Sequence, residues 1–306
     1  MKMNGLSLRD LEYIVAVAEY RHFGKAANGC AVSQPALSIQ IRRLEQKLGV
    51  MIFERSSRRV FLTAHGSVIV DQARTILNEA ERLLELAERG TGPMSGILRL
   101  SAISTLGPYV FPLILRPFKA TYPEVELILG ETQTVQLVED LRAGTADVGL
   151  LATPLDAPDL HLEPVFFEPF VLIHAPNNEV APNDPPSICD LPAEGLLLLE
   201  EGHCLREQAL SLCHRAAPSL QRRHATSLET LRHMVAAGEG WSILPQLAVP
   251  EVDPLRGLIC YKRFAEPDVG RTVALAWRRN SARAEEHLLL ADLLRQVLEP
   301  CDVEAM

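Results

Sequence analysis

The sequence lacks several features that would place it in common classes of protein. No apolar run reaches the about 20 residues that a membrane-spanning helix needs. Charges at Lys2, Arg9 and Asp10 interrupt the apolar stretch that a secretory signal requires. No Walker loop, GxGxxG turn or Ser-His-Asp arrangement is present, and no internal repeat is evident. These absences favour a cytoplasmic globular protein and give no support to an enzymatic function.

Positive charge is scarce over most of the chain and concentrated at one end. The 306 residues carry a net charge of −9, yet residues 1–65 hold ten Lys or Arg against five Asp or Glu. The N-terminal part is therefore suited to a polyanion such as DNA, and the acidic remainder is not. The length allows two or three domains. The six cysteines are expected to be thiols in the reducing cytosol rather than a disulfide framework.

The first 48 residues predict a helix-turn-helix. Apolar periodicity indicates helices over 8–19, 25–30 and 34–48. Ser33 is a suitable N-cap for the third helix, and Pro35 fits its first turn. We expect this helix to bury Leu37, Ile41, Leu44 and Leu48. Two helices joined by so tight a turn form the DNA-reading motif, with the second helix in the major groove.

Two short apolar segments, 50–55 and 60–63, flank a basic run and predict a hairpin, or wing. On the recognition helix, Gln34, Ser38 and Arg42 are placed to reach base edges or phosphates. In the wing, the basic residues are Arg55, Arg58 and Arg59, which we expect to follow the phosphate backbone. A basic hairpin is otherwise a solvated surface, but the adjoining helix-turn-helix favours contact with phosphate.

The next segment predicts one long helix, because no Gly or Pro occurs between Ser67 and Arg89. Its apolar residues alternate in steps of four and three: Ile69, Ala73, Ile76, Ala80, Leu83 and Ala87. Such a heptad seam favours pairing with a second copy, and the alternative is an amphipathic helix packed on its own domain. Residues 90–96 then mark a domain boundary.

After residue 96, short β-rich runs alternate with helical stretches. The expected strands are 98–103, 125–129, 147–151, 170–174, 195–199, 240–244 and 273–277. The expected helices are 108–122, 135–143, 205–216, 228–237 and 284–298. This alternation predicts α/β layers with a mostly parallel sheet.

The N-terminal residues resemble the LysR-type regulators. The resemblance rests on Leu11-Glu12-Tyr13, Phe23, Ala26-Ala27, residues 32–38, Ile41, Leu44-Glu45, Leu48-Gly49 and Phe53-Glu54-Arg55. Residues 202–209 and 225–238 are similar to the peroxide-sensing OxyR subfamily, which places Cys204 and Cys213 at a C-x8-C spacing. The similarity covers almost the whole chain.

This resemblance implies an α/β fold of three parts that assembles as a homotetramer, a dimer of dimers. The implied domains are a winged helix-turn-helix (1–65), a linker and dimerisation helix (66–90), and a redox-sensing effector domain shaped like a periplasmic binding protein (91–306). Lobe I of this domain would comprise residues 96–168 and 271–306, and lobe II residues 169–270. The implied partners are double-stranded operator DNA, hydrogen peroxide, RNA polymerase, and glutaredoxin or thioredoxin as reductant, with no cofactor, metal or membrane.

The resemblance also assigns the redox residues. Cys204 would be oxidised by hydrogen peroxide, and Cys213 would resolve the product into a disulfide. The implied peroxide pocket contains Thr105, Thr134, His203 and Arg206. Two neighbours depart from the subfamily pattern, since Ser104 stands where a proline is expected and Val135 where a histidine is expected.

Elementary chemistry agrees with a reactive Cys204. The start of a helix and the cation of Arg206 both favour a thiolate, which attacks peroxide to give a sulfenic acid. The alternative is that Cys204 and Cys213 are small buried hydrophobes, as intracellular cysteines usually are, and Cys30, Cys189, Cys260 and Cys301 are taken as structural. A zinc site at residues 203–204 and 213–214 has the right ligand types but matches no common spacing.

Two other functions stay open at the level of sequence. One is a thiol-dependent redox enzyme, and the other is a LysR-type sensor of a small metabolite bound between the lobes. For the disulfide that the resemblance implies, a helix from residue 205 onward would keep Cys204 and Cys213 about 13.5 Å apart, whereas a disulfide needs Cα atoms within about 7 Å. A disulfide between them therefore requires this helix to unfold partly.

Overall fold

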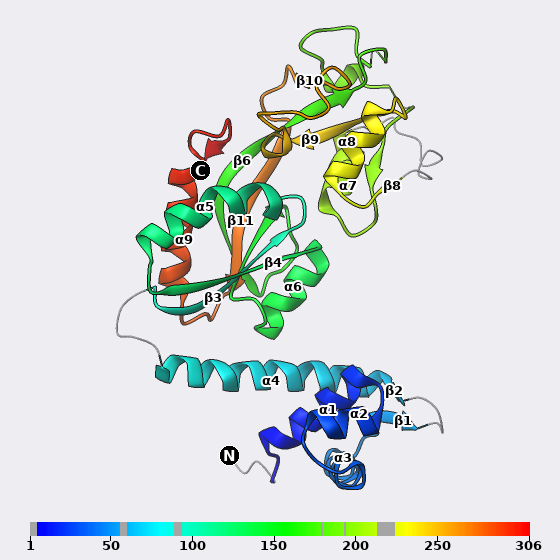
Figure 1. Ribbon diagram of the computed structural model, residues 1–306, viewed down its shortest axis with the longest axis vertical. Coiled ribbons are helices and arrows are strands. Elements are labelled where there is room, and N and C mark those ends of the chain that lie inside the picture. Colours follow the sequence, from blue (N-terminus) through cyan, green and yellow to red (C-terminus); the bar gives the residue numbers. More distant parts are fainter. Residues whose placement is uncertain (1–4, 56–59, 89–93, 179, 193, 213–223) are drawn as a thin grey trace. The chain divides into compact units, whose positions relative to one another are not determined.

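The computed structural model describes residues 5–55, 60–88, 94–178, 180–192, 194–212 and 224–306 (Figure 1). The chain forms two compact units. The N-terminal unit consists of residues 1–89 with 142–145. The effector unit contains the rest. Among the helices within these ranges, none is long and apolar enough to cross a membrane.

The N-terminal unit is built on three helices whose starts are set by capping side chains. These helices are α1 (Leu8–Tyr20), α2 (Phe23–Gly29) and α3 (Gln34–Leu48). Each begins after a side chain that accepts a backbone N–H of the first turn: Ser7, His22 and Ser33. The three expected helices are present, and their bounds differ from the expected ones by only a few residues.

The core of this unit contains Leu37, Ile41 and Leu44 of α3, as expected. Leu48 is a correction, because its side chain is 43% exposed. It is the last residue of α3, and Gly49 follows in the left-handed conformation with φ +69°. The helix therefore ends one turn beyond the core.

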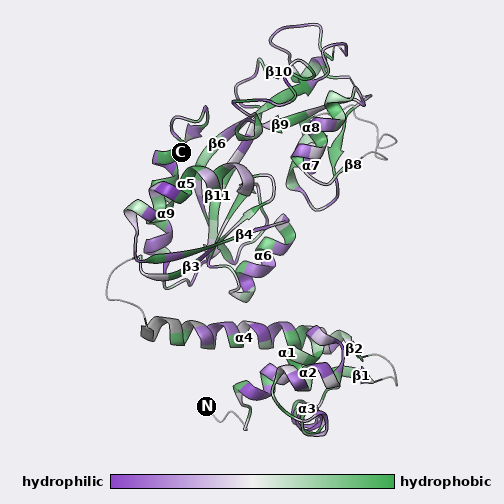
Figure 2. Ribbon diagram, in the orientation of Figure 1, coloured by the Kyte–Doolittle hydropathy of each residue, from purple (hydrophilic) through white to green (hydrophobic). Residues whose placement is uncertain are grey.

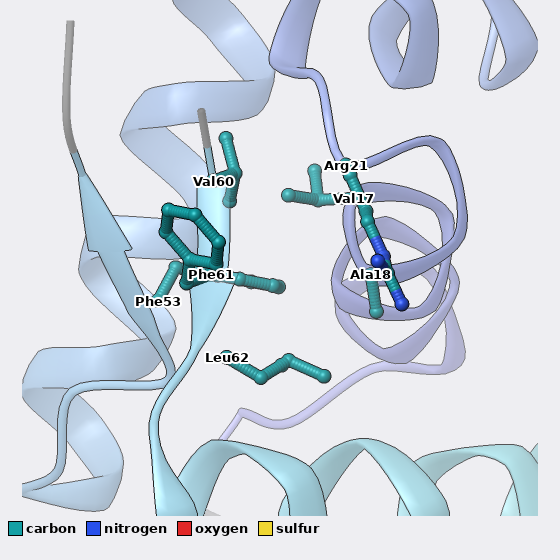
Figure 3. A pocket seen from close by; sticks show the side chains of 7 residues that line it. All are labelled: Val17, Ala18, Arg21, Phe53, Val60, Phe61 and Leu62. Carbon is teal, nitrogen blue, oxygen red and sulfur yellow. The ribbon is translucent and has the colours of Figure 1, made fainter. Parts of the chain in front are cut away.

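The wing is a hairpin of β1 (Phe53–Arg55) and β2 (Val60–Leu62), which pair antiparallel. The Glu45 carboxylate on α3 accepts the backbone N–H groups of Ile52 and Phe53, at 3.0 and 3.2 Å. This side chain joins the recognition helix to the wing. The hairpin leaves an apolar pocket against α1 (Figure 3), lined by Val17, Ala18, Arg21, Phe53, Val60, Phe61 and Leu62.

Helix α4 (Ala64–Glu88) follows the wing directly. Thr63 caps it, since its hydroxyl accepts the N–H of Gly66 and donates to the Met51 carbonyl. A Cβ at Gly66 would lie 2.0 Å from the backbone oxygen of Ile52, so this close approach requires glycine.

The apolar side chains of α4 divide between two environments. Figure 2 shows apolar and polar residues interleaved along the helix. Val70 and Ala73 are buried in the core of the N-terminal unit, whereas Ile76 is 38% and Leu83 is 67% exposed. Two residues of the expected seam, Ile69 and Ala73, thus pack on their own domain, whereas Ile76 and Leu83 are exposed and can be covered by a second surface.

The effector unit begins with a parallel βαβαβ arrangement. Its elements are β3 (Gly96–Ile103), α5 (Gly107–Thr121), β4 (Val125–Thr132), α6 (Thr134–Ala143) and β5 (Val148–Thr153). Strand β3 lies between β4 and β5 and pairs in parallel with both. Helix α5 packs beside α9 (Ala284–Leu298) on one face of the sheet, and α6 covers the other (Figure 1).

The expectation of a mostly parallel sheet is wrong. The five remaining ladders of the eight-stranded sheet are antiparallel. They involve β6 (Leu160–His174), β9 (Trp241–Pro245), β10 (Cys260–Arg263), β11 (Gly270–Arg278) and β12 (Glu304–Ala305). Strands β6 and β11 run beside each other in opposite directions. The alternation of short strands and helices in the sequence gives no sign of this antiparallel pairing.

Strand β6 is also much longer than expected. Pro164 and Pro169 interrupt the sequence pattern, which predicted only residues 170–174. Prolines are tolerated in a strand where a ladder bond is not needed. The ladder with β11 is irregular between Val273 and Ala274, and Pro164 lies opposite Ala274 at this irregularity. The first half of β6 therefore forms despite both prolines.

Two apolar cores lie along β6 and β11. The lobe I core takes Val165 and Phe166 from β6, and the lobe II core begins with Phe170. Lobe II is completed by β7 (Leu198–Leu199), α7 (Cys204–Leu212), β8 (His224–Ala225), α8 (Leu228–Ala236) and the short 3-10 helices Ile188–Asp190 and Gln246–Ala248. The expected strand 195–199 is shorter, and the expected helix 205–216 is described as far as Leu212.

Candidate redox site and DNA-binding surface

Cys204 is the first residue of α7 and lies at the boundary between the two apolar cores. Its half-buried side chain packs against the lobe I core. The following residues of the same helix, Leu205 and Ala209, are buried in the lobe II core. Successive helical residues point in directions about 100° apart, so one short helix contacts both lobes.

His203 is buried beside this cysteine and contacts lobe I. Its ring Nδ1 lies 3.3 Å from the Ser104 hydroxyl, on the loop that follows β3. Its Nε2 is 3.8 Å from the Glu200 carboxylate. Burial lowers the pKa of His203 below its ordinary value, although Glu200 acts in the opposite direction. Burial therefore favours the neutral form of the ring.

The loop before Cys204 is pressed against the start of α6. Gly202 has φ +97°, and a Cβ there would lie 2.3 Å from the Gln133 side-chain oxygen. The Gln133 amide donates to the Glu201 carbonyl at 3.5 Å. The next residue, Thr134, has a buried hydroxyl oxygen with no hydrogen-bond partner in the described part of the chain. The structure thus brings the Thr134 segment to the Cys204 segment.

Thr105 is held by a buried ion pair that sequence reasoning missed. Arg271 donates to the Thr105 hydroxyl at 2.9 Å and to its backbone carbonyl at 3.0 Å. The same guanidinium donates to Glu168 at 2.8 Å, and Glu168 also accepts the N–H of Leu247. Because arginine only donates, the Thr105 oxygen must accept here, which leaves its own proton to be donated elsewhere.

The Arg206 side chain takes part in the hydrogen bonds of lobe II. Its guanidinium is buried and donates to the Leu199 carbonyl at 2.9 Å and to His224 Nδ1 at 3.3 Å. These bonds hold β7 and β8 of lobe II. The expected effect of Arg206 on Cys204 stays a prediction.

The site therefore gathers three segments that are distant in sequence: 104–105, 133–134 and 202–204. Cys213 and residue 214, which would form the second half of the zinc site considered above, lie outside the described residues. Within the described ranges, no group of three or more His, Cys, Asp or Glu could hold a metal ion. Burial raises the pKa of Cys30 and of Cys301, which disfavours a thiolate at either residue.

The exposed face of α3 carries the predicted DNA contacts at intervals of four residues. Gln34, Pro35 and Arg42 are exposed, and Ser38 is half-buried between them. The Arg42 guanidinium folds back on Ser38, donating to its carbonyl at 3.3 Å and its hydroxyl at 3.4 Å. Arg55 ends β1. The other two wing arginines, 58 and 59, lie outside the described residues.

Comparison with known families accounts for both units. The model of the bacterial regulatory helix-turn-helix protein, lysR family, matches residues 8–67, and the LysR substrate binding domain matches residues 91–299. The chain belongs to the LysR family. The predicted fold class is confirmed, namely a winged helix-turn-helix, a long linker helix and a two-lobed α/β effector domain like that of periplasmic binding proteins.

Individual relatives place the chain within one branch of that family. It is 43% identical over 295 residues to the hydrogen peroxide-inducible genes activator of Dickeya chrysanthemi, covering 96% of each chain. It is equally identical over 291 residues to the DNA-binding transcriptional dual regulator OxyR of Escherichia coli, covering 95% of each. The predicted resemblance to the OxyR subfamily is confirmed. These relatives are transcription regulators.

Solved structures of OxyR proteins are also similar to this chain. Full-length OxyR of Pseudomonas aeruginosa with a cysteine-to-aspartate substitution matches with a TM-score of 0.72, 39% identity and 95% coverage of both chains. A cysteine-to-serine mutant of Corynebacterium glutamicum OxyR with bound hydrogen peroxide matches with a TM-score of 0.63 and 33% identity, covering 96% of this chain and 95% of that one.

The buried ion pair makes a prediction about stability. Glu168→Ala should lower the free energy of unfolding of the effector unit by about 3–5 kcal/mol, because it leaves the Arg271 charge buried without a partner. Replacing both residues by apolar ones should recover much of this loss. Both tryptophans, Trp241 and Trp277, lie in the effector unit, so their fluorescence during urea unfolding of the full chain reports this unit alone.

The control is Asp292→Ala, which removes the exposed partner of Arg295 on α9. A surface pair of this kind contributes at most about 1 kcal/mol. If Glu168→Ala also lowers the free energy of unfolding by no more than about 1 kcal/mol, the buried pair does not hold the antiparallel strands β6 and β11 together.

Proposed function

We propose that this chain is a DNA-binding transcription activator that senses hydrogen peroxide through oxidation of Cys204 and formation of a disulfide with Cys213. The observation that carries the proposal is the position of Cys204, at the start of a short helix that contacts both lobes of the effector unit. The names and structures of the OxyR relatives support the same assignment.

The chemistry needs two steps. The Cys204 thiolate attacks one oxygen of hydrogen peroxide, the O–O bond breaks, and the leaving hydroxide takes up a proton to become water. The product is a sulfenic acid on Cys204. The Cys213 thiolate then attacks the Cys204 sulfur, the S–O bond breaks as the disulfide forms, and the leaving hydroxide takes up a proton to become a second water.

The residues around Cys204 suit a small polar oxidant. Thr105 accepts from Arg271 and so retains a proton to donate, and within the described ranges the Thr134 hydroxyl is buried without a partner. An unsatisfied buried hydroxyl is costly unless a ligand or water pairs with it. We assign both threonines and His203 to the peroxide pocket, with Arg206 supporting it from lobe II.

Disulfide formation would convert this chemistry into a change of structure. Helix α7 spans Cys204–Leu212, and its nine residues place the first and last Cα atoms about 12 Å apart. A disulfide from Cys204 to the residue after Leu212 needs Cα atoms within about 7 Å. The bond and the intact helix are therefore incompatible, and unwinding α7 releases its contacts with both lobes.

The output of the switch is DNA binding by the N-terminal unit. We assign base or phosphate contact to Gln34, Ser38 and Arg42, positioning by Ser33 and Pro35, and backbone contact to Arg55, Arg58 and Arg59. The domain bounds are those predicted from the sequence: 1–65, 66–90 and 91–306. The chain would act without enzymatic turnover, in the cytoplasm, on operator DNA and with RNA polymerase.

Assembly through α4 completes the proposal. Ile76 and Leu83 of the heptad seam are exposed within one copy, and a second copy can cover them. Two such dimers would form the homotetramer, and glutaredoxin or thioredoxin would reduce the disulfide and reset the sensor.

The redox switch predicts distinct behaviour for the two cysteines. Cys204→Ser should abolish the response, and Cys213→Ser should still form sulfenic acid but no disulfide. Hydrogen exchange over residues 200–220 should rise in the wild-type chain after stoichiometric peroxide, because α7 unwinds. Mass spectrometry of the same samples identifies the oxidised residue.

The matched control is Cys189→Ser, which removes an exposed cysteine of lobe II and should respond as the wild type does. A mutual disulfide of Cys204 and Cys213 with unchanged protection of α7 would exclude the unwinding. An unmodified Cys204 under these conditions would exclude peroxide sensing.

DNA binding should separate two classes of residue. Arg58→Ala with Arg59→Ala should weaken binding to all sequences and lower the salt slope by about one for each phosphate that is no longer neutralised. Gln34→Ala or Ser38→Ala should mainly reduce discrimination between operator and random DNA. The control is Arg256→Ala with Arg263→Ala, two exposed arginines of the effector unit. Equal salt slopes for wild type and wing variant would remove the wing from the interface.

The α4 seam predicts the route of assembly. Ile76→Asp with Leu83→Asp should raise the dimer dissociation constant more than about a hundredfold, because the buried charges cost several kcal/mol. Val68→Asp, at an exposed position outside the seam, should leave assembly unchanged. Sedimentation velocity across a dilution series measures both, and a double variant that remains dimeric would place the interface elsewhere.

A further inference from the structure

We propose that Ser104 is a positioning residue for the redox switch: its hydroxyl bond to His203 holds the start of α7, and with it Cys204, against lobe I. The inference rests on the proposed function and adds a residue to it. Its basis is the 3.3 Å contact between the Ser104 hydroxyl and His203 Nδ1, which joins two segments 99 residues apart.

Both ends of this contact are fixed by their own lobes. The Ser104 N–H donates to the Thr132 carbonyl at the end of β4, at 3.0 Å, and the next residue, Thr105, is tied to Arg271. On the other side, the His203 carbonyl accepts the N–H of Arg206 in the first turn of α7, at 3.0 Å. A displacement of α7 therefore cannot be absorbed by the serine loop.

The direction of the hydrogen bond follows from the surroundings of the ring. His203 is 7% exposed, its burial lowers its pKa, and its Nε2 faces the Glu200 carboxylate. A carboxylate near Nε2 favours the tautomer with the proton on that nitrogen. Nδ1 is then an acceptor, and the Ser104 O–H donates to it. Glu200 thus sets the tautomer, and the serine bond ties the ring, and with it the backbone before Cys204, to lobe I.

Few hydrogen bonds join lobe I to residues 200–204 within the described chain. They are Ser104 to His203 and the 3.5 Å bond from Gln133 to the Glu201 carbonyl. The second is at the limit of bonding distance, so the serine bond is the stronger restraint.

Because α7 must unwind before Cys204 can reach Cys213, this bond opposes the second step of oxidation and not the first. Peroxide attack occurs with α7 in place, and the His203 contact is retained during that step. Disulfide formation requires the start of α7 to leave lobe I. Ser104 therefore affects how readily a sulfenic acid at Cys204 becomes a disulfide.

The test compares Ser104→Ala, Ser104→Thr and Ser281→Ala in the full-length chain. Ser281 makes a comparable bond, at 3.2 Å, from its hydroxyl to His287 Nε2 on the α9 side of lobe I. Its removal is the matched control, a serine–histidine bond broken away from Cys204. In reduced protein, hydrogen exchange of residues 203–212 should rise about two- to tenfold for Ser104→Ala, with wild-type values for Ser281→Ala and near-wild-type values for Ser104→Thr.

Peroxide kinetics provide the second measurement. Ser104→Ala should accelerate disulfide formation by the same factor as exchange, while sulfenic acid formation, measured in the Cys213→Ser background, should change less than about twofold. Unchanged exchange in α7, or a slower first step with an unchanged second, would overturn the proposal. Faster exchange in a chain whose Cys204 resists peroxide would retain the restraint and reject the proposed function, so the two failures are distinguishable.

Discussion

The ion pair between Glu168 and Arg271 is the contact on which the effector unit depends. Both side chains are fully buried where β6 and β11 pass from one apolar core to the other. Charges in such a place must have all their hydrogen bonds made, because an unpaired one is strongly destabilising. The partners that satisfy them include the Thr105 loop and the start of the 3-10 helix at Leu247. The geometry of the redox site follows from satisfying this pair.

In the proposed switch, helix α7 would transmit the oxidation of Cys204 because it belongs to neither lobe alone. Cys204 contacts the lobe I core, and Leu205 and Ala209 are part of the lobe II core. Arg206 ties the same helix to Leu199 and His224 of lobe II. A covalent change at the Cys204 sulfur would therefore directly change the contacts between the two lobes.

Local patterns in the sequence predicted the helices well and the sheet poorly. Caps such as Ser33 and the apolar periodicity of α3 are encoded within a few residues, and they located the helix-turn-helix. The antiparallel return of β6 and β11 depends on pairing between residues about 100 positions apart, and Pro164 and Pro169 concealed half of β6. The resemblance to OxyR named Cys204, Thr105 and Thr134.

The sequence offered no comparable signal for the pair that holds Thr105, because only the register of two distant strands places Glu168 opposite Arg271. The role of Ser104 was equally hidden, since it depends on a contact across 99 positions. Arg206 is a different case. Its proximity in sequence suggested an effect on the thiol, which stays a prediction, whereas its bonds to Leu199 and His224 of lobe II had no signal in the sequence.

The brevity of α7 has a consequence for the duration of the signal. A helix of nine residues is not stable by itself in water and persists only through its neighbours. Local opening of such a segment takes microseconds to seconds, whereas uncatalysed rearrangement of a disulfide takes minutes to hours. In the proposed switch, the protein would therefore change conformation quickly when the oxidant concentration rises and stay oxidised long after the oxidant is gone. The time for which it stays oxidised would be set by the supply of reducing thiols in the cell.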